Sequence, residues 1–176
     1  RVRCFGINLA RLDIRQEADR HSTLLNELFR KKYNIKYNSL SEKEKIKLLN
    51  KLIKEKNYFV DRINPTNKEN KEVWNTFKQI SKTPHECLGA YVISMTSTAS
   101  DILSVYFLQI QAKIKNFLRV VPLFETLDDL KNANSVMKNL FKLSWYRKMT
   151  SAKQEVMIGY SDSSKDAGKL SASWHQ

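Results

Sequence analysis

The sequence has few residues that bend or cross-link a chain: its 176 residues include 4 glycines, 3 prolines and 2 cysteines. Cys4 and Cys87 lie far apart and show neither a metal-binding nor a disulfide spacing, so we expect a reducing, cytoplasmic compartment. No apolar run is long enough to cross a bilayer, and the basic residues 1–3 lead into a strand-like pattern instead of a signal peptide. These absences argue against a membrane protein and against a secreted domain stapled by disulfides.

Acidic residues are scarce relative to basic ones, which gives a net charge of +13. Residues 21–82 contain 15 Lys and Arg against 7 Asp and Glu, so more than half of the surplus lies in one segment rich in Lys and Asn. Within Ser41–Lys56, an apolar stripe of Ile46, Leu49 and Ile53 is separate from a face of lysines four residues apart. No aromatic residues are interleaved with these lysines for stacking on bases, so nucleic-acid binding is not expected. A basic nucleic-acid-binding module stays open as the non-enzymatic alternative.

Strand and helix patterns alternate four times along the chain, which predicts an α/β fold built from parallel βα units. Strands are predicted over Phe5–Ile14, Gly89–Met95, Leu118–Phe124 and Val156–Tyr160, with helices over Ala18–Lys32, Ser41–Lys56, Glu69–Ser81, Ser100–Lys113 and Leu127–Leu140. Residues 18–84 are too long for a plain crossover and are interpreted as an inserted helical layer. We assign residues 1–176 to a single partial domain, because the chain lacks an initial Met and stops in mid-pattern, as a piece of a longer protein does.

The stretch from Val156 to Gly168 is the most informative in the sequence. A short apolar run, Val156–Ile158, indicates a buried strand and ends at a glycine. A polar cluster with Asp162 and Lys165 follows, and Asp166 or a nearby serine is expected to cap a helix over Ala167–Trp174. An ordinary solvated loop is the alternative interpretation of this cluster.

Three polar residues are expected to converge in such a fold. Arg15, Glu125 and Asp162 each follow the predicted carboxyl end of a different strand, and parallel strands place those ends at one edge. Glutamate and aspartate without Cys or His form a hard oxygen site suited to Mg²⁺ or Mn²⁺. Arg15 offers a planar fork for a phosphate or carboxylate, and Lys165 adds a mobile positive charge. The pattern predicts a metal-assisted site for a small phosphorylated acid, whereas Asp128 and Asp129 fit a helix start better than a metal site.

Four motifs in order resemble phosphoenolpyruvate carboxylase of the bacterial and plant type. They are Phe5–Glu17, Ala90–Met95, Pro122–Leu130 and Gly159–Gly168. The last looks like that family's lysine-containing active-site signature and is complete at every fixed position. The resemblance runs from about Phe5 to Trp174 and is weakest across Lys31–Lys82.

The resemblance implies part of a large β/α (TIM-like) barrel with extensive additional helices, assembled as a cytoplasmic homotetramer. It implies carboxylation of phosphoenolpyruvate by bicarbonate to give oxaloacetate and phosphate with Mg²⁺ or Mn²⁺. Glu125 and Asp162 would be the metal ligands, Lys165 would act on bicarbonate, and Arg15 would contact the substrate phosphate. In that chemistry bicarbonate attacks phosphorus, and the resulting enolate captures carbon dioxide.

The sequence departs from the family in two respects. None of His21, His85 and His175 lies in the family's Thr-Ala-His-Pro-Thr motif, and the downstream Gly-rich, Arg-bearing loops are missing. His21 fits a position within a helix. We therefore expect this chain to carry the metal half of a site without turnover by itself. Another phosphoenolpyruvate-handling barrel enzyme, without bicarbonate dependence, is the alternative among enzymes.

Overall fold

The computed structural model describes residues 10–56, 58–60, 64–168 and 173–174, except the side chains of Ser161, Asp162 and Ala167. Its elements in chain order are β1 (Leu12–Glu17), α2 (Ala18–Tyr33), η1 (Tyr37–Ser39), α3 (Glu42–Glu55), α5 (Lys68–Lys82), η2 (His85–Cys87), β2 (Leu88–Ser94), α6 (Ala99–Gln111), β3 (Arg119–Phe124), α7 (Leu127–Phe141), α8 (Ser144–Met149), β4 (Met157–Ile158) and α9 (Tyr160–Ala167). Among the described residues, no helix combines the length and the apolar character that crossing a membrane requires.

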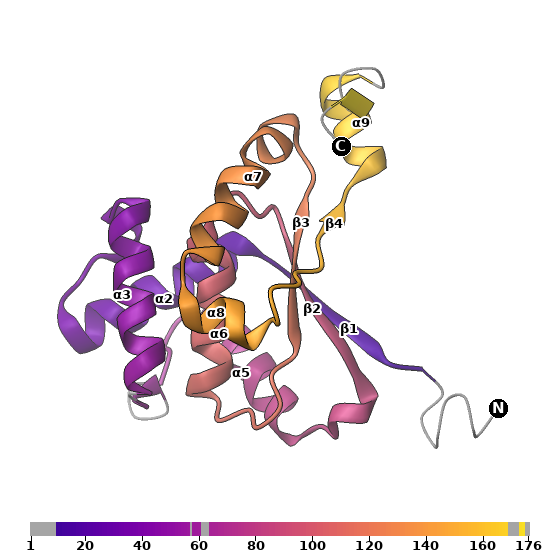
Figure 1. Cartoon of the computed structure of the whole chain (residues 1–176). Coiled ribbons are helices and arrows are strands. Elements are labelled where there is room, and N and C mark those ends of the chain that lie inside the picture. Colours follow the sequence, from indigo (N-terminus) through magenta and orange to yellow (C-terminus); the bar gives the residue numbers. More distant parts are fainter. Residues whose placement is uncertain (1–9, 57, 61–63, 169–172, 175–176) are drawn as a thin grey trace.

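The four strands form one parallel sheet in the order β1-β2-β3-β4 (Figure 1). Arg15 lies level with Val92 of β2, and Val92 lies level with Val121 of β3. Because every pair is parallel, all carboxyl ends meet at the same edge. The predicted α/β class with parallel βα units is confirmed, and closure into a full barrel stays a prediction.

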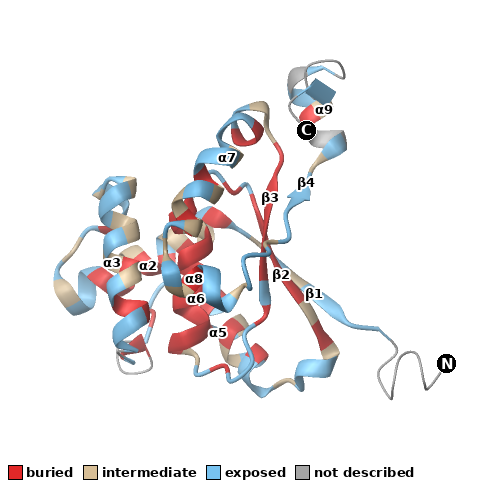
Figure 2. Cartoon of the chain, viewed as in Figure 1, coloured by how far each residue is buried: buried red, intermediate tan, exposed pale blue. Residues whose placement is uncertain are grey.

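The long helices gather on one side of this sheet and enclose the main core (Figure 1). Helix α6 lies at the centre of that core, with twelve of its thirteen residues buried (Figure 2). Tyr91 and Ile93 of β2 and Val120 and Phe124 of β3 point into the same core. The alternate strand residues belong to a second, small apolar cluster, made of Ala90, Val92, Val121 and Leu123. The two clusters reflect the period-two alternation of side chains across a sheet.

The helices between β1 and β2 form where the apolar periodicity predicts them. Helix α3 begins with a capping box, in which Ser41 and Glu44 satisfy each other's backbone N–H groups. Helix α5, predicted over Glu69–Ser81, buries Val73, Trp74 and Phe77 on one face. Described residues of the 18–84 segment form α2, α3 and α5, whose apolar faces share one core with the rest of the chain. An inserted layer with its own boundaries remains a prediction.

The structure corrects both ends of the sheet. The first strand was predicted over Phe5–Ile14; its described part is Leu12–Glu17, so Arg15 lies within a strand, and residues 5–9 lie outside the described part. At the other end, the predicted buried strand over Val156–Tyr160 is reduced to two residues, and Met157 and Ile158 are 39% and 43% exposed. Their apolar character does not bury them, because among the described residues β4 pairs only with β3.

A helix starts earlier near the C-terminus than the sequence suggests. We expected Asp166 or a serine to cap a helix over Ala167–Trp174, but α9 runs from Tyr160 to Ala167 and already contains Asp166. Of the predicted helix, residues 173–174 are helical and residues 169–172 lie outside the described part. Gly168, with φ of +79°, follows as its C-cap, a conformation that a glycine adopts without strain. The polar cluster after Gly159 is therefore helix, not loop.

Candidate active site

Arg15 and Glu125 meet at the carboxyl edge of the sheet. Arg15 Nη2 donates a hydrogen bond of 3.1 Å to Glu125 Oε1, which joins β1 to the end of β3 across β2. The Glu125 side chain is 11% exposed and that of Arg15 is 57% exposed. An ion pair with one buried partner and one exposed partner leaves much of the guanidinium available to a ligand.

A backbone amide takes the second oxygen of the same carboxylate. Met95 N–H donates a 2.8 Å hydrogen bond to Glu125 Oε2. Met95 directly follows β2 and has φ of +54°, the left-handed conformation that is costly for a residue with a side chain. Sequence reasoning missed this contact, because a backbone N–H leaves no signal in residue type.

The glycine that opens the 159–168 motif lies directly against Glu125. Gly159 N–H donates to Phe124 O at 2.9 Å, which holds the two backbones together. A Cβ at Gly159 would lie 3.1 Å from Glu125 Cγ and 3.3 Å from Glu125 Cα. The close approach, not a special backbone angle, explains why the smallest residue suits this position.

The start of α7 fixes the backbone that follows Glu125. Thr126 and Asp129 form a capping box, and Asp129 Oδ2 also accepts a 3.4 Å hydrogen bond from Glu125 N–H. The expectation that Asp129 serves the helix start is thereby confirmed. Asp166 Oδ2 accepts from Leu127 N–H at 3.0 Å, so it ties α9 to α7. Both contacts favour one position of Glu125 at this edge.

Two of the residues named from sequence lie on α9. Asp162 is in the first turn of that helix, but its side chain lies outside the described part of the structure. Lys165 is exposed in the last turn. The described contacts join Arg15 to Glu125, and none of them joins Lys165 to either residue. The roles assigned to these four residues stay predictions.

The donor chemistry at this edge suits a hard cation. Glu125 presents two carboxylate oxygens, and the helix that carries Asp162 begins directly after Gly159, which contacts Glu125. Among the described side chains, no group of three or more His, Cys, Asp and Glu could hold a metal ion. Mg²⁺ and Mn²⁺ are commonly held by one or two carboxylates, with water and substrate completing the shell. The single described carboxylate of Glu125 is compatible with that arrangement.

A series of side-chain hydrogen bonds links β1 to β2 and α2. Tyr91 OH donates to Gln16 Oε1 at 2.8 Å, and His21 Nε2 lies 2.7 Å from the same hydroxyl. Since the Tyr91 proton goes to Gln16, His21 Nε2 must carry the proton that it donates to Tyr91. Burial, together with the charge of Arg20, lowers the pKa of His21 to about 3, so the imidazole stays neutral. His21 lies in α2, as predicted, but its link to the neighbour of Arg15 was missed.

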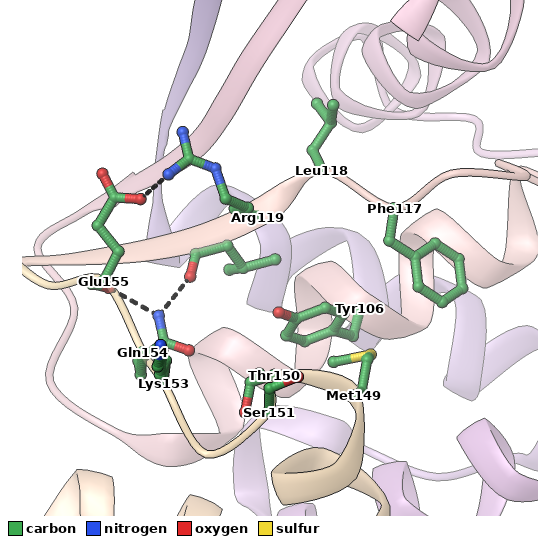
Figure 3. A pocket seen from close by; sticks show the side chains of 11 residues that line it. Tyr106, Phe117, Leu118, Arg119, Met149, Thr150, Ser151, Lys153, Gln154 and Glu155 are labelled. Carbon is green, nitrogen blue, oxygen red and sulfur yellow. Dashed lines mark hydrogen bonds and ion pairs between the residues drawn. The ribbon is translucent and has the colours of Figure 1, made fainter.

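The hollow drawn in Figure 3 lies at the opposite end of the sheet. Its volume is about 490 Å³, and Tyr106, Phe117 and Met149 form its apolar wall. Arg119, at the first position of β3, forms an ion pair with Glu155 at its rim. Ligands of parallel α/β sheets bind at the carboxyl ends of strands. The hollow is at the amino end, so it is separate from the Arg15–Glu125 edge.

Comparison with known proteins finds one family along the full chain. A family model described as phosphoenolpyruvate carboxylase matches residues 1–176. Proteins named phosphoenolpyruvate carboxylase from Enterobacter sp. (strain 638), Escherichia coli O1:K1 / APEC and Shigella boydii serotype 18 are 48%, 47% and 47% identical to this chain. Each alignment covers 100% of this chain and 20% of the relative, so the chain spans about one fifth of their length. With a match along its entire length, the chain belongs to the phosphoenolpyruvate carboxylase family.

Proposed function

We propose that this chain carries the metal-holding part of an active site that carboxylates phosphoenolpyruvate with bicarbonate, giving oxaloacetate and phosphate. The observation that carries the proposal is the contact between Arg15 and Glu125 at the carboxyl edge of the sheet, with Gly159 of the signature motif packed against Glu125. Family membership supports the proposed reaction, and this contact supports the choice of the carboxyl edge as the location of the site.

Glu125 and Asp162 are the proposed ligands of Mg²⁺ or Mn²⁺. When bound, the ion would stabilise negative charge that develops on substrate oxygens. Glu125 is suited to the role because Met95, Asp129 and Gly159 fix its position before any ligand arrives. A ligand held in place in this way loses little conformational entropy on binding.

The two cations have separate proposed roles. Arg15 projects from β1 with 57% of its side chain exposed, and its planar fork matches the oxygens of a phosphoryl group. Lys165 is exposed on α9, where its ammonium can approach the anion bicarbonate. Together they would position bicarbonate for attack on the phosphoryl group.

The larger assembly is also part of the proposal. Further strands would continue the sheet from β1 and β4 into a β/α barrel. The full-length protein would form a cytoplasmic homotetramer and would contain the Thr-Ala-His-Pro-Thr motif and the Arg-bearing loops that this sequence lacks. The 176-residue chain alone is then expected to show no turnover. Oxaloacetate formation by that isolated chain would contradict the assignment of an incomplete site.

The test uses the full-length product of the reading frame that encodes this sequence. Oxaloacetate formation from phosphoenolpyruvate is followed with and without bicarbonate and Mg²⁺, beside Asp162→Asn and a surface control, Asp128→Asn. We expect activity that requires bicarbonate, collapses in Asp162→Asn and persists in Asp128→Asn. Phosphoenolpyruvate consumption without bicarbonate dependence would refute the proposed reaction, and full activity of Asp162→Asn would refute the metal assignment.

A further inference from the structure

Both oxygens of the Glu125 carboxylate are already engaged by donors. Oε1 accepts from the Arg15 guanidinium at 3.1 Å, and Oε2 accepts from the Met95 backbone N–H at 2.8 Å. The carboxylate is 11% exposed, so few directions of approach remain open. A cation that binds Glu125 therefore has to share the carboxylate with these donors or displace one of them.

The two donors differ in what a cation would do to them. The Met95 N–H is neutral and part of the backbone, and a carboxylate oxygen has a lone pair to spare beside such a bond. Arg15 carries a full positive charge, which a divalent ion at the same oxygen would repel. Arg15 is therefore the partner that has to leave.

The structure also indicates which side of the ion pair can move. Glu125 is held by Met95, by the Asp129 cap and by the packing of Gly159. Arg15 is a long side chain with 57% exposure on β1, a strand that pairs only with β2 among the described residues. A rotamer change moves the guanidinium without disturbing the sheet.

We propose that Arg15 and the divalent cation compete for Glu125, so that Arg15 occupies this carboxylate until the cation displaces it. An anionic phosphoryl group relieves the competition, because it draws the guanidinium away from the carboxylate. Binding of the cation and of the phosphoryl group then strengthen each other, reciprocally and to the same extent. This inference rests on the proposed function and adds to it a coupling between the two ligands.

The test measures Mn²⁺ binding, not turnover. Free Mn²⁺ is followed by electron paramagnetic resonance during titration of the full-length protein, with and without inorganic phosphate as the probe. Arg15→Met removes the charge without adding a metal ligand. Arg20→Met is the matched control, since Arg20 forms a similar 3.2 Å ion pair, but with Glu72 instead of Glu125.

An ion pair with an exposed partner contributes about 1 kcal/mol, which corresponds to about a fivefold change in affinity. We expect Arg15→Met to bind Mn²⁺ about fivefold tighter than wild type without phosphate, and phosphate to tighten binding in wild type but not in Arg15→Met. Arg20→Met should behave as wild type. Unchanged Mn²⁺ affinity in Arg15→Met would overturn the inference, as would an undiminished phosphate effect in that variant.

Two further variants separate this inference from the proposed function. Glu125→Gln should weaken Mn²⁺ binding strongly, and Arg15→Lys, which keeps the charge, should stay close to wild type. Unaltered Mn²⁺ binding in Glu125→Gln would refute the metal assignment itself. Weak binding in Glu125→Gln with no gain in Arg15→Met would leave the metal assignment intact and refute only the competition. Circular dichroism of each variant verifies that it is folded.

Discussion

Lowering the pH from 7 to 5 is expected to reduce the free energy of unfolding through His21. Burial, and secondarily the charge of Arg20, lowers the pKa of this imidazole from 6.5 to about 3. The unfolded chain binds a proton at His21 as the pH falls through 6.5, whereas the folded chain does not until about pH 3. Stability is therefore present above pH 6.5 and is lost as the pH falls toward 3; at pH 5 the loss amounts to about 2 kcal/mol.

Among the described contacts of His21, none would compensate a positive charge on the imidazole. Its ring contacts Phe77 and Tyr91, its Nε2 bonds the Tyr91 hydroxyl, and the positive charge of Arg20 opposes protonation. Glu27 acts in a different window: burial raises its pKa, but hydrogen bonds, foremost from Lys31, outweigh this and bring it to about 2. That contribution is lost only as the pH falls below about 4.5. Burial also raises the pKa of Glu42 and of Asp101 toward this interval, so the contribution of the imidazole is taken from the difference between wild type and a His21 variant.

The assay is urea unfolding of the 176-residue chain at pH 7 and pH 5, followed by tryptophan fluorescence. His21→Gln is compared with wild type, since glutamine keeps an N–H for Tyr91 and does not titrate. Wild type should lose about 2 kcal/mol more than the variant between the two pH values. Equal losses would refute the claim that a neutral, buried His21 is part of this fold.

Three further changes test other contacts. Gly89→Ala places a Cβ 2.1 Å from Asp13 Oδ1, so Asp13 has to turn away from the Ala90 N–H that donates to it at 2.6 Å; the cost should be about 1–3 kcal/mol in urea unfolding, and a neutral result would show that this hydrogen bond contributes nothing. Thr126→Ala removes the α7 cap and should cost about 1 kcal/mol in thermal unfolding, whereas an unchanged midpoint would show that the capping box contributes nothing. Gly159→Ala presses on Glu125 Cγ, so it should weaken Mn²⁺ binding. A lower unfolding midpoint with unchanged Mn²⁺ affinity would show that the glycine serves packing alone.

The parts of the fold that depend on local pattern were predictable. The apolar spacing of α2, α3 and α5 locates those helices within one or two residues, and the Ser41–Glu44 capping box stands in the sequence as it does in the structure. The contact between Arg15 and Glu125 was predictable in part: Glu125 follows β3 as expected, whereas Arg15 lies within β1 and reaches the carboxyl edge with its long side chain.

The parts that depend on distant neighbours were not predictable. Val156–Ile158 has the apolar character of a buried strand, yet its burial depends on what pairs with β4 and not on its own residue types. His21 and Tyr91 are separated by 70 positions, so their hydrogen bond has no local signature. Met95 contributes a backbone N–H, which any residue except proline could supply.

The proposed metal site is tested most directly by anomalous X-ray diffraction from crystals of the full-length protein with Mn²⁺. We expect an anomalous peak in contact with carboxylate oxygens of both Glu125 and Asp162, with the Arg15 guanidinium moved off Glu125 Oε1. A Mn²⁺ peak elsewhere, or at Glu125 without Asp162, would contradict the metal assignment. Mn²⁺ at both carboxylates with the 3.1 Å Arg15–Glu125 hydrogen bond still in place would contradict the competition between Arg15 and the metal.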